Sequence, residues 1–231
     1  AAMRRRPQIW ARSCSRRAAS LSVHNGVLVI ACGALAREIT ELKRSYGWKH
    51  LRLQCIDAKL HTRPGEIPRR VRVLIRENRA SFEHIFVAYA DCGTGGMLDH
   101  VLREEGVERL PGAHCYDFFA GRKRFAALST AEPGTFYLTD FLVRHFERLV
   151  IEPLGLDEHP ELRDAYFGNY TRVVYLSQTR DSQMLDAAEL AAARLSLPFE
   201  HIHCGLGELE TELTQRVSRW GDGEEDLRLL A

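Results

Sequence analysis

The sequence lacks the features that would place it in a class at once. No apolar run is long enough to cross a membrane, and no tandem repeat is present. Lys and Arg number 32 against 31 Asp and Glu, so the net charge is only +1 and no global field attracts nucleic acid or an anionic membrane. We therefore expect a small-molecule substrate, and neither a nucleic acid nor a membrane as partner.

Cysteine is too scarce for a disulfide framework. The 231 residues contain six cysteines, widely dispersed, and four of them lie in or beside apolar runs typical of strands. Neither a CxxC nor an HExxH motif is present to indicate a standard metal site. This usage favours a reducing compartment, and we expect the protein to be cytoplasmic.

The first 25 residues contain no acidic side chain and many arginines. We interpret residues 1–25 as a flexible basic extension. A leader peptide that makes Cys32 a lipid anchor is the alternative, but the break at 24–26 interrupts its apolar region, and cleavage would remove the first strand.

From Gly26 onward, short β-branched runs alternate with amphipathic stretches. This order predicts an α/β fold with a doubly wound, mostly parallel Rossmann-like sheet. The length fits one large domain or two pseudo-repeated halves, 26–130 and 131–231, the second beginning with a linking helix. The expected strands are 27–31, 51–56, 84–90, 172–176 and 201–204, and the expected helices are 34–46, 67–78, 95–105, 139–150, 184–195 and 206–220.

Two cysteines share one position in this pattern. Cys32 and Cys92 each follow an apolar run and precede a glycine and a helical stretch, so both should reach the carboxyl edge of the sheet. Cys115, with His114 beside it, is a third candidate. Three thiolates suit zinc or an iron–sulfur cluster and leave an open coordination position. The alternative for each cysteine is a packed core residue.

Three polar side chains are candidates for proton transfer at this site. His61 occupies a loop after the second strand, Glu38 lies near the start of the first helix, and His114 neighbours Cys115. His61 and Glu38 could equally be solvated surface residues.

Two segments are candidates for holding a cofactor or substrate. Gly93, Gly95 and Gly96, like Gly33, follow a strand and allow close approach of the backbone to a ligand, although the lysine of a Walker loop is missing. Residues 132–139 are predicted to form a closing loop, in which Thr135 and Tyr137 would donate hydrogen bonds. A tight turn and a helix cap are the plain alternatives.

Five blocks carry a family resemblance: CGALAREI at 32–39, LHTRP at 60–64, YADCGTGG at 89–96, HCYDFFAG at 114–121 and PGTFYLTDFLVRHFE at 133–147. Together they resemble an uncharacterised bacterial and archaeal family, domain of unknown function 1638, over about residues 26–210. The resemblance implies recurrent cysteines at Cys32, Cys92 and Cys115. It also implies one-carbon metabolism, with a corrinoid or methyltransferase protein as partner.

Three hypotheses follow. The first is a metal-dependent enzyme with an iron–sulfur cluster or zinc on three cysteines, of the lyase, hydrolase or methyl-transfer class. The second is a non-catalytic accessory protein that binds a metal or cofactor for a methyltransferase system. The third is metal-free nucleophilic catalysis by Cys92, activated by His114 or His61.

Overall fold

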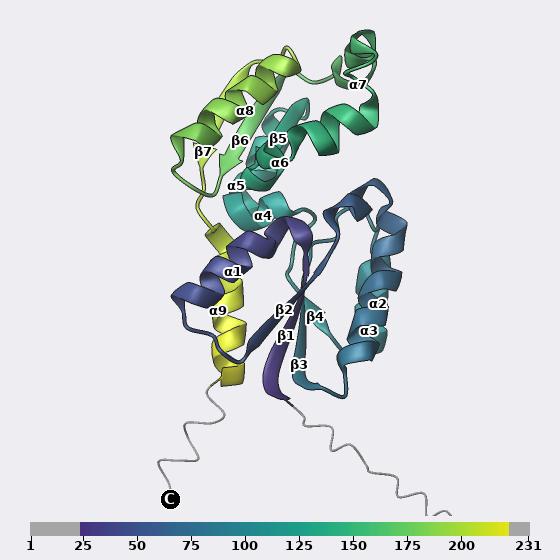
Figure 1. The fold of residues 1–231 in the computed structure, drawn as a ribbon, viewed down its shortest axis with the longest axis vertical. Helices are drawn as coiled ribbons and strands as arrows, with labels where there is room; N and C mark the ends of the chain where they lie inside the picture. The colour runs from purple at the N-terminus through teal and green to yellow at the C-terminus, as the bar shows by residue number, and fades with distance from the viewer. Residues whose placement is uncertain (1–23, 222–231) are drawn as a thin grey trace, which may run out of the picture.

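A computed structural model describes residues 24–221 and shows two all-parallel β-sheets (Figure 1). The α/β class and the parallel pairing expected from the sequence are confirmed, and the chain forms two sheets rather than one. The first unit has four strands in the order β2-β1-β3-β4. Its strands are β1 (His24–Cys32), β2 (Leu51–Ile56), β3 (Phe82–Ala88) and the two-residue β4 (Glu108–Arg109).

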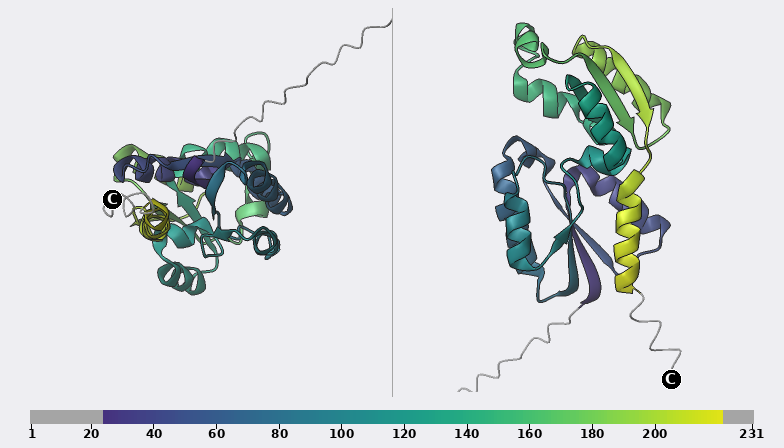
Figure 2. Two further views of the ribbon diagram at one scale, coloured as in Figure 1. Left: turned by 90° about the horizontal axis from the view of Figure 1, so that it is seen from below. Right: turned by 180° about the vertical axis from the view of Figure 1, so that it is seen from behind.

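Helices cover both faces of the first sheet, with α1 on one face and α2 and α3 on the other (Figures 1 and 2). Residues 27–31 of the central strand β1 are therefore almost completely buried, which explains why that strand is continuously apolar. Gly106 ends α3 in the left-handed conformation, at φ 63°. The helices are α1 (Ala36–Ser45), α2 (Ile67–Asn78) and α3 (Met97–Glu105).

The second unit is a three-stranded sheet of order β5-β6-β7 with its own two cores. Phe125 of α5 and Tyr116 of α4 pack on one face, while the alanine-rich side of α8 packs on the other. The elements are α4 (Cys115–Ala120), α5 (Arg122–Ala131), β5 (Thr135–Thr139), α6 (Asp140–Arg144), α7 (Arg163–Phe167), β6 (Arg172–Ser177), α8 (Ser182–Arg194) and β7 (Phe199–His203).

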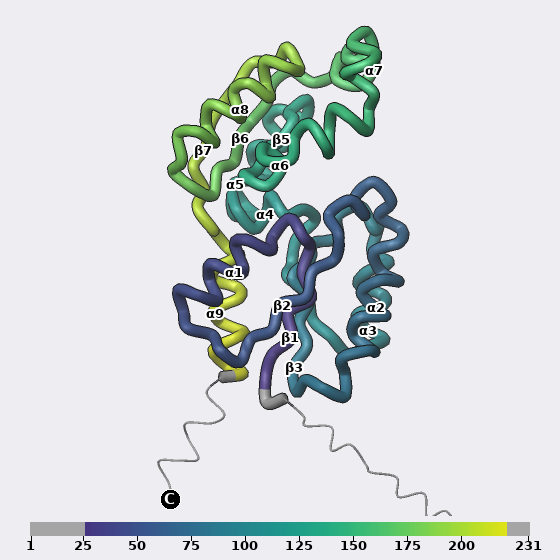
Figure 3. Tube along the Cα trace, viewed as in Figure 1, coloured from purple at the N-terminus to yellow at the C-terminus, as the bar shows by residue number. Residues whose placement is uncertain are grey.

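The last helix, α9 (Gly207–Gly221), returns to the first unit. Figure 3 shows the chain running from β7 back to the first sheet, where α9 lies beside α1. Leu209, Leu213 and Val217 of α9 are fully buried in the first core. The division expected at residue 130 placed this helix in the second half, whereas its apolar side completes the first.

Two segments differ from the sequence-based expectations. The predicted closing loop at 132–139 is largely strand β5, because the β-branched and aromatic residues of 135–139 pair with β6. The predicted helix at 139–150 is interrupted: α6 ends at Arg144, and a π-helical turn spans Glu147–Ile151. Within residues 24–221, no helix is both long enough and apolar enough to cross a membrane. The expected basic extension, residues 1–25, lies almost wholly outside the described range.

The carboxyl ends of the strands in both sheets point toward the junction between the units (Figure 2). Ligands of parallel α/β sheets bind at this edge, where the loops leave the strands. The junction is therefore the place where residues from both units can reach one ligand.

Candidate functional site

The structure brings Cys32, Cys92 and Cys115 together at the junction. Cys32 ends β1, Cys92 follows β3, and Cys115 is the first residue of α4. The thiols of Cys32 and Cys92 both act electrostatically on Cys115, and Cys32 acts on Cys92, so the three sulfurs occupy one small region. Cys55, which the sequence pattern placed in the core, is exposed on β2 instead.

Burial keeps these three thiols protonated. Desolvation raises the pKa of Cys32 to about 11 and that of Cys92 to about 12, and it raises the pKa of Cys115 well above its usual value. At neutral pH the cluster therefore consists of neutral thiols.

The backbone at Cys92 is strained. Its φ is 48°, in the left-handed region that favours glycine, and its N–H donates to the carbonyl of Ala113 at 2.8 Å. The backbone of Cys115, at the start of α4, partly opposes the rise in the pKa of the Cys92 thiol. The strained conformation therefore holds the Cys92 thiol against the start of α4.

Two rings border the thiols. The Tyr89 side chain is fully buried, and its hydroxyl lies next to the Cys32 sulfur without a well-aligned hydrogen bond. His61 stacks on Tyr89 with ring centroids 5.7 Å apart.

The tautomer of His61 follows from one contact. Its Nδ1 lies 2.8 Å from the carbonyl oxygen of Ala58, which can only accept, so Nδ1 carries the hydrogen and Nε2 is free. Desolvation lowers the pKa of His61, and the nearby His114 lowers it further. His61 is therefore a neutral imidazole with an available lone pair, suited to accept a proton or bind a metal.

Glu38 connects the two units. It is buried on α1, and its Oε2 has no hydrogen-bond partner. Desolvation raises the pKa of its carboxyl, Arg144 of α6 opposes the rise, and Asp140 adds to it.

Asp140, which the sequence analysis did not single out, is the most heavily hydrogen-bonded carboxylate of the junction. It is fully buried and accepts from the Tyr175 hydroxyl at 2.6 Å and from the Thr179 hydroxyl at 2.6 Å. The amides of Gln178 and Thr179 and the guanidinium of Arg144 complete its partners. The Thr139-Asp140 pair was visible in the sequence as a helix cap, but its partners come from a strand end 38 residues away in the chain.

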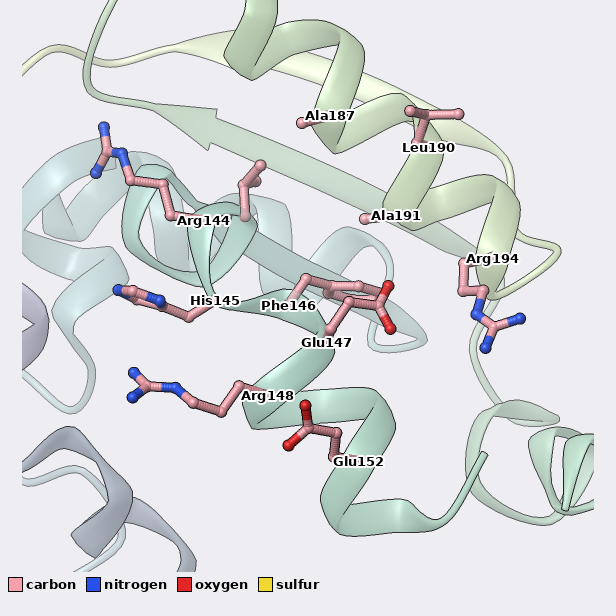
Figure 4. A pocket seen from close by; sticks show the side chains of 11 residues that line it. Arg144, His145, Phe146, Glu147, Arg148, Glu152, Ala187, Leu190, Ala191 and Arg194 are labelled. Atoms are coloured by element: carbon pink, nitrogen blue, oxygen red, sulfur yellow. The ribbon is translucent and has the colours of Figure 1, made fainter. Parts of the chain in front are cut away.

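A cavity of about 200 Å³ lies where the units meet. His61, Lys59 and Cys115 line it from one side, and Thr139, Phe141 and Leu149 line it from the other. A larger, more open groove of about 790 Å³ lies between the α6 segment and α8, and Figure 4 shows its lining. That groove contains none of the residues predicted from the sequence, so the smaller cavity is the better candidate site.

The glycines predicted to approach a cofactor have other contacts. The amides of Gly95 and Gly96 donate to the carboxylate of Asp91, at 3.1 and 2.9 Å. Gly93 packs on Pro64, and a Cβ at Gly33 would lie 3.0 Å from the carbonyl oxygen of Ile56. These glycines permit tight strand-to-helix turns.

Three further predicted residues do not line the cavity. Thr135 lies at the start of β5, far from its carboxyl end, and its hydroxyl donates to Glu132. Tyr137 packs between Tyr116 and Phe125. His114 is exposed at the N-cap of α4. The prediction placed Thr135 and Tyr137 in a closing loop, whereas they lie in strand β5, which pairs with β6.

Among residues 24–221, no set of three or more His, Cys, Asp or Glu side chains is already arranged to coordinate a metal ion. The donor types nevertheless fit a thiophilic metal in their chemistry, since three thiols and the free imidazole nitrogen of His61 lie at the same junction. In the described arrangement the Cys32 sulfur accepts a hydrogen bond from the amide of Ala34 at 3.4 Å.

The fold and the site define a class: a two-unit α/β protein with a thiol cluster at the junction of its parallel sheets. The chain belongs to the family described as protein of unknown function (DUF1638), whose model matches residues 55–213. The family resemblance seen in the sequence is thus confirmed, and the matched range includes Cys92 and Cys115 but begins after Cys32. Searches of curated proteins and of solved structures found no match.

Proposed function

We propose that Cys32, Cys92 and Cys115 bind a zinc ion or an iron–sulfur cluster, and that this centre acts on a small molecule in the adjoining cavity. The observation that carries the proposal is the convergence of three thiols, from three separate elements, beside a cavity lined by both units. Three protein ligands leave a coordination position for water or substrate.

The ionisation of the thiols supports metal binding over metal-free nucleophilic catalysis. A nucleophilic cysteine needs a lowered pKa, whereas burial raises the pKa of all three thiols here. A thiophilic metal replaces the thiol proton and so overcomes the cost of ionisation. The proposal includes rotation of the thiols toward a common point.

His61 is the side chain best placed to move a proton. It lines the cavity together with Cys115, and its Nε2 is free to accept. Glu38 carries a buried, unpartnered oxygen near Arg144 and would hold a proton at neutral pH more readily than an exposed glutamate. Bound at this site, the metal would supply Lewis acidity or an activated water, as in lyases, hydrolases and some methyl-transfer enzymes.

All five cysteines in the described range are free, which supports a reducing compartment such as the cytoplasm. A non-catalytic role, in which the cluster holds a metal or cofactor for a corrinoid or methyltransferase protein, is the second candidate. The cavity beside Cys115 favours catalysis, because an accessory protein has no need of a substrate pocket lined by both units.

Metal analysis of protein purified without oxygen tests the proposal. We expect stoichiometric zinc, or iron with the absorption of a cluster, in the wild type, and a large loss in each of Cys32→Ser, Cys92→Ser and Cys115→Ser. Cys55→Ser is the matched control, since Cys55 lies exposed on the same sheet and should leave the metal content unchanged.

Two outcomes would overturn the ligand set. One is a folded wild-type protein that stays metal-free after anaerobic reconstitution, and the other is loss of metal in only one of the three variants. Rapid transfer of the metal to a chelator, with no dependence on small molecules, would favour the accessory role.

A further inference from the structure

We infer that Tyr89 is a positioning residue of the proposed metal centre, and that its hydroxyl donates a hydrogen bond to the Cys32 sulfur once that sulfur is a metal-bound thiolate. The inference rests on the proposed function for the metal itself. It is carried by the strand register, which brings Tyr89 next to Cys32, and by a buried hydroxyl without a hydrogen-bond partner.

The register of the first sheet brings Tyr89 and Cys32 together. Strands β1 and β3 run parallel, and their last paired residues are Ala31 and Ala88. Cys32 and Tyr89 are the next residues of the two segments, and both are buried in the first core. The Tyr89 hydroxyl accordingly lies next to the Cys32 sulfur. The closest sulfur to this hydroxyl therefore belongs to one of the three proposed ligands.

The hydroxyl of Tyr89 is unpaired within residues 24–221. The side chain is 0% exposed, and its oxygen has no hydrogen-bond partner among the described residues. A buried tyrosine hydroxyl normally finds a partner, because leaving it unpaired costs free energy. Phenylalanine would fill the same space without that cost. The hydroxyl therefore indicates an acceptor stronger than the neutral Cys32 thiol beside it.

The ring of Tyr89 is fixed from the side of the cavity. His61 lines the cavity and stacks on the ring, with centroids 5.7 Å apart and an interplanar angle of 16°. Tyr89 itself does not line the cavity. Because the ring is enclosed, the hydroxyl can turn only its hydrogen about the C–O bond. Its donor is therefore aimed at the thiols and does not reach a substrate in the cavity.

Metal binding would turn the Cys32 sulfur into the acceptor that this hydroxyl lacks. The neutral thiol is a weak acceptor, and it already accepts from the amide of Ala34 at 3.4 Å. A metal-bound thiolate carries negative charge and accepts stronger hydrogen bonds. Groups that bond to the ligands of a metal fix their orientation and strengthen metal binding. Tyr89 is placed to do this for Cys32.

Anaerobic titration with cobalt tests the inference, because cobalt reports on thiolate ligands by its absorption. The protein is first stripped of metal with a chelator. Tyr89→Phe should weaken cobalt binding about tenfold or more, the range for losing a hydrogen bond to a metal ligand. The sulfur-to-cobalt charge-transfer absorption should also move to longer wavelength, because the sulfur loses a donor that stabilises its electrons. A purely structural role would leave this absorption unchanged.

The same substitution should have the opposite effect on the stripped protein. There Tyr89→Phe should raise the urea midpoint, since it removes an unpaired buried hydroxyl. Tyr137→Phe is the matched control. The Tyr137 hydroxyl is also buried without a hydrogen-bond partner, but it lies in a core of the second unit that contains none of the three cysteines. Its removal should leave cobalt binding unchanged.

Unchanged cobalt affinity or absorption in Tyr89→Phe, or a lower urea midpoint in its stripped form, would overturn the inference. An equal loss of affinity in Tyr137→Phe would overturn it as well. With a wild type that binds stoichiometric cobalt, each of these results leaves the metal proposal standing. A wild type that binds no cobalt overturns the inference, and the metal proposal fails with it only when iron is absent too.

Discussion

Burial controls the chemistry of the single residues at the junction. Cys32, Cys92 and Cys115 have raised pKa values because the protein removes water around them, and His61 has a lowered one for the same reason. All four groups are therefore neutral at pH 7.

Alkylation rates test the state of the thiols. At pH 7.5 we expect iodoacetamide to modify exposed Cys55 faster than Cys92, because the raised pKa and partial burial of Cys92 leave little thiolate. The Cys92 rate should rise about tenfold per pH unit up to its pKa of about 12. Peptide mass spectrometry at several time points measures both rates, and faster labelling of Cys92 than of Cys55 at pH 7.5 would contradict the prediction.

Glu38 predicts a pH-dependent effect on stability. Because burial raises its pKa, the folded protein loses stability when Glu38 ionises as the pH rises. Glu38→Gln should therefore raise the free energy of unfolding, relative to the wild type, more at pH 8 than at pH 4. At pH 4 Glu38 is largely protonated in both the folded and the unfolded protein, so the substitution removes little charge. Urea unfolding at the two pH values measures the difference, and Glu41→Gln, exposed on the same helix, is the control.

At the scale of elements, the turn after β3 places a cysteine where glycine would be more stable. Cys92 occupies a left-handed conformation in which a side chain costs about 1 kcal/mol relative to glycine. A residue kept in strain at a sheet edge is typical of functional positions.

Two substitutions that each remove the Cys92 sulfur, one to glycine and one to alanine, measure the cost of this backbone strain. We expect Cys92→Gly to be more stable than Cys92→Ala by about 1 kcal/mol, as measured by the urea midpoint. Ser196→Gly, at the end of α8 with φ 55°, is the comparison, because that residue is strained but lies far from any proposed chemistry. If the Ala and Gly variants have equal stability, the backbone at Cys92 is not strained.

Element prediction succeeded where local pattern and tertiary packing agree. Residues 51–56 and 67–78 form the predicted strand and helix with the predicted bounds. In the helix the apolar spacing matches the buried face, which contains Ile67, Val71, Leu74 and Ile75. Prediction from the sequence failed for β5, because the Pro-Gly turn at 133–134 indicated a loop. Pairing with β6, which is distant in sequence, makes that segment a strand.

At the scale of the whole molecule, the return of α9 joins the two units. The chain leaves the first sheet after β4 and comes back with α9 to complete the first core, so the first unit is built from two separate stretches of sequence. The described chain therefore crosses the junction twice, which helps to fix the walls of the cavity.

A substitution of Leu213 tests how much α9 contributes to the stability of the first unit. It is fully buried in the first core, and Leu213→Ala should destabilise the protein by about 2–5 kcal/mol, the range for a buried leucine. Leu190→Ala is the control, since Leu190 on α8 is 71% exposed and its loss should change stability little. Urea unfolding followed by tryptophan fluorescence reports on the first unit through Trp48, which is buried in its core. A small effect of Leu213→Ala would show that α9 is dispensable.

The sequence by itself determined the α/β class, most strands and helices, the family, and the strand-end positions of Cys32 and Cys92. These follow from hydrophobic periodicity and glycine turns, which act over a few residues. Only the tertiary structure decided that there are two sheets, that α9 returns to the first, that Lys59 and Thr139 line one cavity with Cys115, and that Tyr175 and Thr179 bind the Asp140 carboxylate. The physical reason is that these arrangements depend on contacts between residues far apart in the chain, whose burial and partners no local pattern specifies.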